Sequence, residues 1–329
     1  MTGTSAGDAR RRLRIATYNL ESLGEEDLGD RIAALRGPLV ALDADILCLQ
    51  ELNAEKVGGR RRLSALAALL AGTPYAAYEV VSTTRPGGEP ADVHNLAIAS
   101  RLPILAHRQL RHDLVERPTY RLATAVPPAE APAPVEWERP ILTAEIGLGD
   151  GRSLHVLNLH LRAPLAAPVA GNKLGATSWR TASGWAEGFF LAATKRAGQA
   201  LEARLAVDAL LDADPAALVV VAGDLNADLY EMPLRILRAD PDDTGNPALA
   251  GRALVAAEAR VAEARRFTVL HGGRRLLLDH LLLSAPLARR LVSVEIANDG
   301  LPDEAASPPV PGYAGSYHAP VVAEFDLAD

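Results

Sequence analysis

The sequence predicts an α/β protein in which two packed β-sheets are covered by helices on their outer faces. Predicted strands outnumber predicted helices along the 329 residues. Several strands, among them 46–49 and 219–222, are apolar on both faces, as strands must be when protein covers both sides of a sheet. Two sheets packed face to face, with helices outside, accommodate such strands.

In the first half of the chain, the apolar pattern alternates between strand and helix. Helical spacing predicts a helix over 30–43, broken near Gly37-Pro38 because proline disrupts the helical hydrogen bonds. A second helix is expected over 60–71, ending at Gly72. Strands are expected at 13–19, 46–51, 75–83, 95–100 and 104–110.

The second half begins with a Pro/Ala-rich segment, 127–134, which is expected to be extended and mobile. A long helix is expected over 195–211, and shorter helices over 231–238 and 253–264. Strands are expected at 139–146, 154–160, 219–222, 267–270, 276–283, 291–296 and 321–325.

Composition excludes several classes of protein. The apolar content excludes a disordered chain, and the net charge of −7 argues against a protein wrapped broadly around nucleic acid. Cys48 is the single cysteine, so no intrachain disulfide forms, and we expect it to be a buried apolar residue. The basic residues 10–12 precede no apolar segment, and no stretch is long enough to span a membrane. We therefore expect a soluble, cytoplasmic protein.

Polar residues follow many of the predicted strands. After the apolar run 219–222, Gly223 permits a turn, and alternation places Asp224 and Asn226 on the same side. Taken alone, this pair is equally well explained as a turn cap and the start of a turn. Six polar strand ends in one chain, however, predict a shared hydrolytic site. They carry Asn19, Glu51, Asn158 with His160, Asp224 with Asn226, Asp279, and His318.

These residues lie in six short motifs: Thr17-Tyr18-Asn19, Leu49-Gln50-Glu51, Asn158-Leu159-His160-Leu161, Gly223-Asp224-Leu225-Asn226, Leu278-Asp279-His280 and Ser316-Tyr317-His318-Ala319-Pro320-Val321. In this order they resemble the endonuclease/exonuclease/phosphatase family, the superfamily of deoxyribonuclease I. Most of the motifs are weak individually, whereas the ordered set, running from residue 13 to the end, is specific. The resemblance implies a four-layer α/β sandwich of two mostly antiparallel sheets flanked by helices. We expect a tail at 1–11 and one catalytic domain over 12–329, with an insertion at 162–194.

Hydrolysis of a phosphate ester requires neutralisation of the phosphate charge, activation of water and assistance to the leaving group. Hard oxygen ligands suit Mg²⁺ or Mn²⁺, and we expect Glu51 to bind the metal with Asn19 beside it. Asp224 and Asn226 are expected to orient the attacking water and the phosphate. Asp224 is also a candidate for contact with the metal.

The histidines at the strand ends are candidates for proton transfer. Asp279 is expected to hold the imidazole of His318, which would then act as a general base or acid. His160, with Asn158, is expected to bind a phosphoryl oxygen or to protonate the leaving group. Which histidine performs which task is left open. The resemblance makes Arg139 a candidate phosphate ligand, and a surface arginine is the alternative.

The other histidines have no such motif around them. Alternation turns His280 away from Asp279, so a structural role is expected, and His94 is expected to be solvated. No His/Cys cluster has the spacing of a zinc site, and no strand-to-helix turn carries a nucleophilic serine.

Tyr317 departs from the family pattern, which has aspartate at this position. A tyrosine is neutral at pH 7, so it cannot replace that charge, although it can donate a hydrogen bond to a phosphate oxygen. The site is therefore expected to carry one fewer negative charge. The alternative is that another acid, from the 298–304 loop, fills the gap.

The 162–194 insertion is rich in Gly, Ala, Ser and Pro but holds two of the three tryptophans and two of the four phenylalanines, which argues against disorder. Its charges are mostly basic in an acidic chain. We expect it to form a substrate wall beside His160; an insertion packed by its own aromatic residues is the alternative.

The leading hypothesis is a metal-dependent phosphodiesterase or nuclease. The alternatives are a phosphomonoesterase acting on a small or lipid phosphate, and a non-catalytic binding protein on the same fold. The acidic net charge disfavours long duplexes, whereas the basic aromatic insertion suits stacking of single-stranded bases. The oligomeric state is left open.

Overall fold

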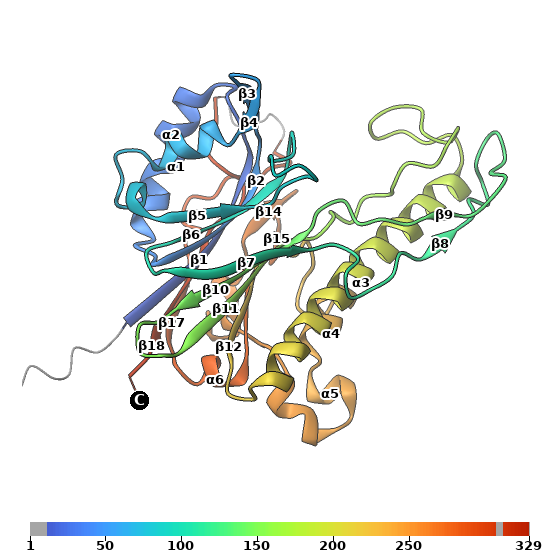
Figure 1. Ribbon diagram of the computed structural model, residues 1–329. Helices are drawn as coiled ribbons and strands as arrows, with labels where there is room; N and C mark the ends of the chain where they lie inside the picture. Colours follow the sequence, from blue (N-terminus) through green and yellow to red (C-terminus); the bar gives the residue numbers. More distant parts are fainter. Residues whose placement is uncertain (1–11, 307–311, 329) are drawn as a thin grey trace, which may run out of the picture.

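The computed structural model describes residues 12–306 and 312–328, and its centre is a pair of six-stranded β-sheets (Figure 1). The tail expected at 1–11 lies outside the described residues. The first sheet has the order β17-β18-β1-β2-β6-β5, with β1 (Arg12–Leu23), β2 (Ile46–Leu52), β5 (Glu79–Ser82), β6 (Asn95–Ser100), β17 (Leu291–Ile296) and β18 (Val321–Asp326). The second has the order β13-β16-β12-β11-β10-β7, with β7 (Ile104–Leu110), β10 (Ile141–Gly147), β11 (Ser153–His160), β12 (Leu218–Asp224), β13 (Val255–Ala256) and β16 (Asp279–Leu283).

Each sheet has one parallel pair at its centre, and the strands around it are antiparallel. The parallel pairs are β1–β2 and β11–β12. A parallel pair needs a crossover connection, and helices α1 (Leu28–Ala41) and α3 (Ala182–Ala213) supply the two crossovers. The carboxyl ends of two parallel strands lie at the same edge of a sheet. The topology therefore brings together the carboxyl ends of four strands: β1 and β2 from the first sheet, and β11 and β12 from the second.

Helices cover both outer faces. Helix α1 and helix α2 (Ser64–Leu70) pack on the first sheet, where Leu35 contributes to an outer core with Leu47. One large core joins the facing sides of both sheets to α3 and to α4 (Met232–Arg238), and it includes Ile15, Val220 and Val207. These are four layers, helix, sheet, sheet and helix, so the predicted α/β sandwich is confirmed (Figure 1).

Short elements complete the chain. Three two-stranded hairpins pair β3 with β4, β8 with β9, and β14 with β15. Their bounds, with those of the short helices and 3₁₀ turns, are β3 (Glu55–Val57), β4 (Arg60–Arg62), β8 (Thr119–Tyr120), β9 (Ala133–Pro134), β14 (Val269–His271), β15 (Arg274–Leu276), α5 (Pro241–Thr244), α6 (Ala285–Ala288), η1 (Pro74–Ala77), η2 (Pro247–Arg252), η3 (Ala257–Arg260) and η4 (Glu263–Arg265).

Four local predictions are wrong. In the strand expected over 75–83, the first residues form the 3₁₀ turn η1, and β5 begins only at Glu79. Helix α1 continues through Pro38, because the buried residues Leu35 and Leu39 hold it on the sheet on both sides of the proline. Residues 60–62 form β4, and the helix expected over 60–71 begins at Ser64. The segment 253–264 is not a helix: β13 adds to the edge of β16, and 3₁₀ turns follow.

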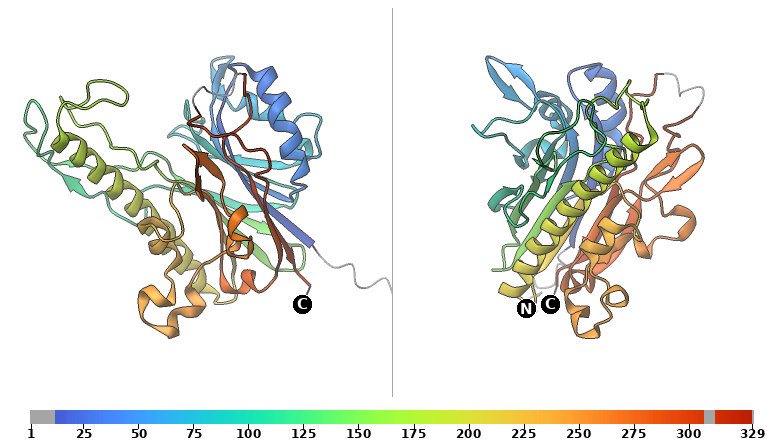
Figure 2. Two further views of the ribbon diagram at one scale, coloured as in Figure 1. Left: turned by 180° about the vertical axis from the view of Figure 1, so that it is seen from behind. Right: turned by 90° about the vertical axis from the view of Figure 1, so that its right-hand side faces the viewer.

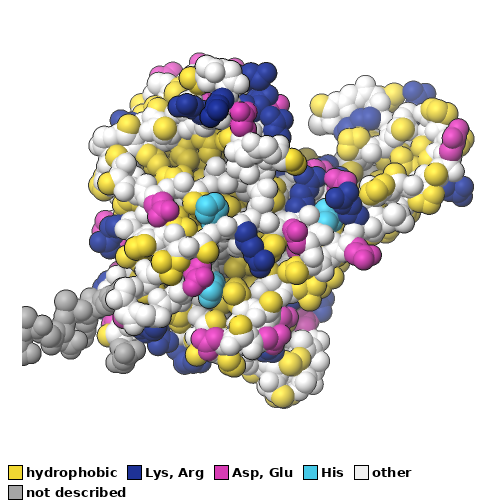
Figure 3. Space-filling model, in the orientation of Figure 1, with side chains coloured by type: hydrophobic (Ala, Val, Ile, Leu, Met, Phe, Trp, Pro, Cys, Tyr) yellow, Lys and Arg dark blue, Asp and Glu magenta, His cyan; other side chains and the backbone are white. Residues whose placement is uncertain are grey.

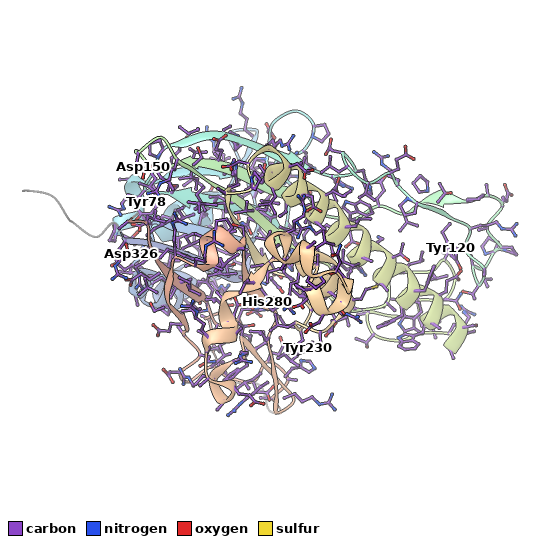
Figure 4. All side chains as sticks on the ribbon, turned by 90° about the horizontal axis from the view of Figure 1, so that it is seen from below. Tyr78, Tyr120, Asp150, Tyr230, His280 and Asp326 are labelled. Carbon is purple, nitrogen blue, oxygen red and sulfur yellow. The ribbon has the colours of Figure 1, made fainter. Side chains whose placement is uncertain are left out.

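The largest difference concerns the insertion. Helix α3 begins at Ala182, with the Thr181 hydroxyl accepting a hydrogen bond from Gly184 N as its cap, thirteen residues before the expected start at Lys195. Its second half lies on the second sheet, and its first half projects from the body (Figures 1 and 2). Residues 162–196 and 117–136, which include the β8–β9 hairpin, form this projection, here called the arm. Figure 4 places Tyr120 far out on the arm and His280 within the body.

Within the described ranges, no helix is both long and apolar enough to cross a membrane.

Candidate functional site

Four of the predicted site residues lie at the carboxyl ends of the two parallel strand pairs. Asn19 is on β1 and Glu51 is on β2, while His160 and Asp224 end β11 and β12 side by side in register. The Asn19 amide nitrogen is 3.0 Å from Asp224 Oδ2 and 3.4 Å from Glu51 Oε1, so it bridges the two sheets. Parallel pairing at the centre of each sheet thus assembles the site at one edge of the sandwich.

Gly223 shows why the second sheet can turn at this point. Its φ is +137°, and a Cβ at this position would lie 1.8 Å from the carbonyl oxygen of Leu159 on β11. Only glycine fits this close approach of two backbones. The chain then turns so that Asn226 N donates to Asp224 Oδ1 at 2.9 Å. The Asn226 side-chain nitrogen donates to Asp224 Oδ2 at 3.1 Å and to Leu161 O at 3.0 Å, which fixes the Asp224 carboxylate.

Asp279 and His318 form a hydrogen-bonded pair beside Asp224. Asp279 lies opposite Asp224 in the antiparallel β12–β16 pair. Its Oδ2 is 2.8 Å from His318 Nδ1. The Ser316 hydroxyl donates to Asn19 O at 2.8 Å and accepts from His318 N at 3.0 Å, which connects the last motif to the first strand.

Burial and crowding shift the pKa values of this cluster apart. Burial raises the pKa of Asp224 to about 7, and the charge of Asp279 adds to that shift. Burial alone would lower the pKa of His318, but the charges of Asp279 and Asp224 and the hydrogen bond to Asp279 raise it to about 10. Burial and the positive charge of Arg139 lower the pKa of His160 well below its usual range. At neutral pH, His318 is a cation and His160 is neutral.

His160 and Arg139 line the other side of the cluster. His160 Nε2 lies 3.3 Å from Asp224 Oδ2 and 3.7 Å from Glu51 Oε1. The Arg139 guanidinium makes a 3.5 Å contact with the His160 carbonyl oxygen. Among the described residues, no carboxylate forms an ion pair with Arg139, and its Nε is buried without a hydrogen-bond partner. Arg139 is therefore a cation available to an anionic ligand.

The structure does not bring Asn158 into this cluster. Its side chain has no exposed surface; it donates to Leu49 O and Ala97 O and accepts from Gln50 Nε2 at 2.8 Å. These bonds connect the two sheets behind the site, so the position does not favour the phosphate-binding role predicted for Asn158. Tyr317 lies next to His318, and its ring packs against Tyr313 with the centroids 4.8 Å apart.

Two residues at the site were missed by the sequence reasoning. His94, expected to be solvated, lies with Nδ1 3.9 Å from Glu51 Oε2 and with its ring 6.4 Å from that of His160. Glu21 accepts a hydrogen bond from Tyr317 N at 2.7 Å. Both residues have a positive φ, +58° for His94 and +50° for Glu21. This conformation is uncommon in non-glycine residues and cannot be predicted from the sequence. The nearest signal is position, because His94 directly precedes β6 and Glu21 follows Asn19 by two residues.

The donors in this cluster fit a hard divalent metal ion. Two groups have ligand atoms within 4.8 Å of one another: Glu51 with His160 and Asp224, and Asp224 with Asp279 and His318. Within residues 12–306 and 312–328, Asp279 Oδ1 is buried and has no hydrogen-bond partner, which leaves an acceptor unused. Carboxylate oxygens suit Mg²⁺ or Mn²⁺. Asn19, expected beside Glu51 at the metal, presents its nitrogen to the Glu51 and Asp224 carboxylates while its oxygen accepts from Glu21 N, so its position favours orienting these two carboxylates.

A polar cavity of about 360 Å³ adjoins the site where the arm joins the body. His94 and Arg139 are shared between the cavity wall and the site, and Arg85, Arg111 and Thr84 also line it. Figure 3 shows Lys and Arg side chains gathered at this junction. At the root of the arm, Arg162 and Lys195 pair with Glu138, the neighbour of Arg139. The predicted insertion therefore begins directly beside the cluster.

Comparisons with known proteins identify the family and the fold. The model of the Endonuclease/Exonuclease/phosphatase family matches residues 16–318. Among curated proteins, none matches the sequence significantly. Truncated TDP2 from Caenorhabditis elegans superposes with a TM-score of 0.57 at 16% identity, over 96% of this chain and 98% of that one. The mannosyl-6-phosphatase Bt3783 of Bacteroides thetaiotaomicron gives 0.58 at 15% identity, over 94% and 98%. At these identities, the likeness shows a shared fold.

Proposed function

The chain belongs to the endonuclease/exonuclease/phosphatase family, and we propose that it hydrolyses phosphodiester bonds with the help of Mg²⁺ or Mn²⁺. The observation that carries the proposal is the pairing of opposite charges at one edge. Glu51, Asp224 and Asp279 belong to one cluster, and the charges of Glu51 and Asp224 act on Arg139, which forms no ion pair among the described residues. An arrangement of this kind binds a cation and a phosphate next to each other.

Glu51 and Asp224 would hold the metal ion, with Asn19 orienting both carboxylates. Bound there, the ion neutralises phosphate charge and supplies a more acidic water. Hydrogen bonds from neighbouring residues fix the orientation of the Glu51 carboxylate. Ser22 donates from its backbone N and its hydroxyl to Glu51 Oε2, at 3.0 and 3.1 Å, which leaves Glu51 Oε1 directed toward Asp224 and His160.

In the absence of a metal ion, Asp224 would be a candidate general base. A pKa of about 7 lies near the operating pH, where a base combines an available carboxylate with useful basicity. Asn226 holds this carboxylate with two hydrogen bonds, so one orientation is fixed before substrate binds. Metal binding at the same carboxylate would lower this pKa, and then Asp224 orients the water more than it deprotonates it.

His318 is the candidate electrostatic stabiliser and proton donor. With a pKa of about 10, it stays protonated at neutral pH and stabilises the negative charge that develops on the phosphoryl oxygens. Asp279 fixes the orientation of its ring through Nδ1. Arg139, whose charge acts on His160 as that of His318 does, adds a second positive charge, and neutral His160 can donate one hydrogen bond to a phosphoryl or leaving-group oxygen.

Turnover of bis-p-nitrophenyl phosphate, measured with Mg²⁺, with Mn²⁺ and with EDTA, tests the proposal. We expect activity with either metal, loss in EDTA and recovery when the metal is restored in excess. Glu51→Gln should bind metal more weakly at near-normal folding, whereas Glu26→Gln, an exposed charge-matched control, should behave like the parent. Undiminished turnover in excess EDTA would contradict metal dependence, and no turnover under any condition would favour a non-catalytic binding protein.

A phosphomonoesterase is the second candidate, and the polar cavity is the observation in its favour. Arg85 and Arg111 in its wall are paired with Asp92 and Glu136, whereas Arg139 forms no ion pair among the described residues and suits a small leaving group that carries hydroxyl or anionic groups. One structural neighbour bears the name mannosyl-6-phosphatase. Comparing p-nitrophenyl phosphate with the diester distinguishes the candidates, because a monoester brings one more negative charge to the same site.

The arm supports a further part of the proposal, namely that it selects the substrate. Trp185 and Phe189 lie about half exposed on α3 with ring centroids 5.6 Å apart, and such rings offer a stacking surface for bases. Replacing both by serine should weaken hydrolysis of single-stranded oligonucleotides more than that of the small diester. Leu105→Ser, an exposed apolar residue on β7, is the matched control. Equal losses on every substrate would instead assign the arm a structural role.

A further inference from the structure

The long helix α3 contacts the site on two sides, where the arm joins the body. Arg196 donates from its guanidinium to the carbonyl oxygen of Asn226 at 2.6 Å. Gln199 donates from its side-chain amide to the carbonyl oxygen of Arg139 at 3.0 Å. We propose that both are positioning residues for the hydrolytic site, one for the turn that orients Asp224 and the other for the backbone that carries Arg139. The inference rests on the proposed hydrolytic function and adds to it two residues that act through their neighbours.

Helical spacing places the two side chains on one face of α3. They are three residues apart, a separation at which side chains are neighbours on a helix. Both are buried, with exposed fractions of 7% for Arg196 and 2% for Gln199. Long polar side chains are seldom buried this far unless specific hydrogen bonds compensate for the loss of water. Their shared burial therefore indicates a specific contact between the helix and the site.

The turn after β12 is held in part by Arg196. Asn226 has a φ of +49°, and its backbone and side-chain nitrogens donate to the two oxygens of Asp224. Arg196 binds the carbonyl oxygen of the same asparagine, and the next carbonyl oxygen, that of Ala227, accepts from His280 Nε2 at 2.8 Å. Left-handed conformations of non-glycine residues persist where the surroundings impose them, often at functional sites. Two side chains from different elements thus fix two successive carbonyl groups of this turn.

An ion pair with Glu231 does not account for the burial of Arg196. The Glu231 carboxylate lies 3.4 Å from the guanidinium, and its side chain is half exposed. Ion pairs in contact with water contribute little to stability, whereas burial alone lowers the pKa of Arg196 and so opposes its charge. The buried hydrogen bond to the carbonyl oxygen of Asn226 is therefore the contact that distinguishes this arginine.

On the other side of the site, α3 holds two consecutive residues of the segment before β10. Lys195 pairs with Glu138 at 2.9 Å, and Gln199 binds the carbonyl oxygen of Arg139. Across residues 12–306 and 312–328, no acid forms an ion pair with Arg139, although the charge of Glu51 acts on it. The position of this guanidinium therefore depends on how its backbone is anchored, and Gln199 is one of the anchors.

The same helix provides a matched control for Arg196. Arg204 is 6% exposed and donates to the carbonyl oxygens of Leu237 and Arg252, and it pairs with Asp208. It is therefore an equally buried arginine on α3 that also binds backbone carbonyl groups, but these groups belong to the segments around α4 and η2. Replacing either arginine by methionine keeps an apolar stem and removes the donors, so general destabilisation affects both variants.

Steady-state kinetics on bis-p-nitrophenyl phosphate at saturating Mn²⁺ tests the role of Arg196. We expect Arg196→Met to lower kcat by about 10–100-fold, the usual effect of losing an orienting partner at a metal site, with a nearly unchanged KM. Arg196→Lys keeps a donor toward the Asn226 carbonyl oxygen and should recover most of the loss. Hydrogen exchange of the 225–228 amides, measured without metal, should accelerate in Arg196→Met and stay parent-like in Arg204→Met.

Gln199→Leu should give a different kinetic signature. Because Arg139 is proposed to bind the phosphate, loosening its backbone should weaken substrate binding and raise KM by roughly fivefold while kcat stays near that of the parent. Thermal unfolding checks that each variant is folded at the assay temperature. A fall in kcat at unchanged KM would overturn the proposed link between Gln199 and Arg139.

The outcomes separate the inference from the function on which it rests. Equal losses of kcat in Arg196→Met and Arg204→Met would overturn the inference, because both losses would then reflect the stability of the fold. Parent-like kinetics of Arg196→Met would also overturn it, while metal-dependent hydrolysis by the parent would keep the proposed function in place. If the parent protein hydrolyses no ester with either metal, the proposed function fails, and the inference fails with it.

Discussion

On the arm and at the strand ends the chain buries carboxylates, but it surrounds them differently. Glu187 of α3 accepts hydrogen bonds from Ala123 N, from the backbone and hydroxyl of Thr124, and from the Tyr120 hydroxyl. Nearer the body, Glu202 accepts from three successive backbone nitrogens, 112–114, and from Trp137 Nε1. Neutral donors thus occupy every oxygen of these two acids.

At the strand ends, Asp224 also accepts hydrogen bonds at both oxygens, from Asn19 and Asn226, but a second buried acid, Asp279, lies opposite it. Asp224 and Asp279 oppose each other on adjacent strands, and the charge of Asp279 helps to raise the pKa of Asp224. Asp279 Oδ1 and His160 Nδ1 are buried and have no hydrogen-bond partner in the part of the chain that the structure describes. A buried carboxylate that is fully hydrogen-bonded stabilises its surroundings, whereas crowded and partly unpaired acids store unfavourable electrostatic energy that a ligand can relieve. We therefore expect substitutions of the strand-end residues to reduce hydrolysis, and substitutions of the arm carboxylates to reduce stability.

The largest effect should come from His318 and Asp279. We expect His318→Ala and Asp279→Asn each to reduce hydrolysis by about 10²–10⁴-fold, the usual contribution of a positioned proton-transfer group. Because the two side chains act as one unit, the double variant should lose little more than either single variant. Steady-state kinetics on the small diester measures this. Fully multiplicative losses would show that Asp279 does not serve His318.

Gly223→Ala should give the largest loss of stability. Its Cβ would collide with Leu159 O, and its φ of +137° is strained for alanine, so we expect the free energy of unfolding to fall by about 3 kcal/mol or more. Gly29→Ala is the control, since a Cβ there meets nothing within 4 Å, and it should change stability by less than about 0.5 kcal/mol. Chemical denaturation of both variants provides the measurement, and similar values would contradict the close approach of β11 and β12.

Glu187→Gln should reduce the stability of the arm without changing hydrolysis of the small diester. Replacing one acceptor oxygen by an NH₂ group leaves buried donors unpaired, at a cost of about 1–3 kcal/mol. Hydrogen exchange of the 119–124 amides should accelerate, while turnover of the small diester should stay unchanged. Glu130→Gln, exposed on the same arm, should alter neither. A parallel loss of diester turnover would show that the arm is coupled to the site.

The smallest effect concerns pH. In the folded protein the pKa of Asp224 is about 7, above its ordinary 3.8, so without metal its contribution to stability falls as pH rises through 7. Metal binding needs the ionised carboxylate, so the increase in Tm on adding Mg²⁺ should be greater at pH 8 than at pH 6. Differential scanning fluorimetry compares the two. An increase independent of pH would place the metal away from Asp224.

The fold and most of the strand-end site could be predicted because they depend on short, local patterns. Apolar runs ending in Asn19, Glu51 or Asp224 identify both the strand and its polar end. Alternation also placed Asp224 and Asn226 on one side, and the two are hydrogen-bonded to each other. The positions of these residues follow from strand geometry, whereas their roles stay predictions.

The start of α3 and the position of Glu21 could not be predicted, because both depend on distant contacts. Gly184 and Gly188 weaken helix propensity, yet a Cβ at either would lie 2.3 Å from Asn172 or Ala167 O, so the loop before α3 requires them. Glu21 lies near His318 because of a left-handed irregularity fixed by Arg31. Neither the loop contact nor the irregularity has a local signature.

The pairing of the last strand with the first has a consequence during synthesis. β1 lies between β2, which follows it closely in the chain, and β18, which is made almost at the end. The Ser316 hydroxyl reaches Asn19 O across 297 residues, and His318 arrives with the same segment. Until this segment leaves the ribosome, the nascent chain has an open edge on β1 and lacks one side of the cluster. The first sheet and the cluster therefore cannot be completed before residues 316–326 have been synthesised.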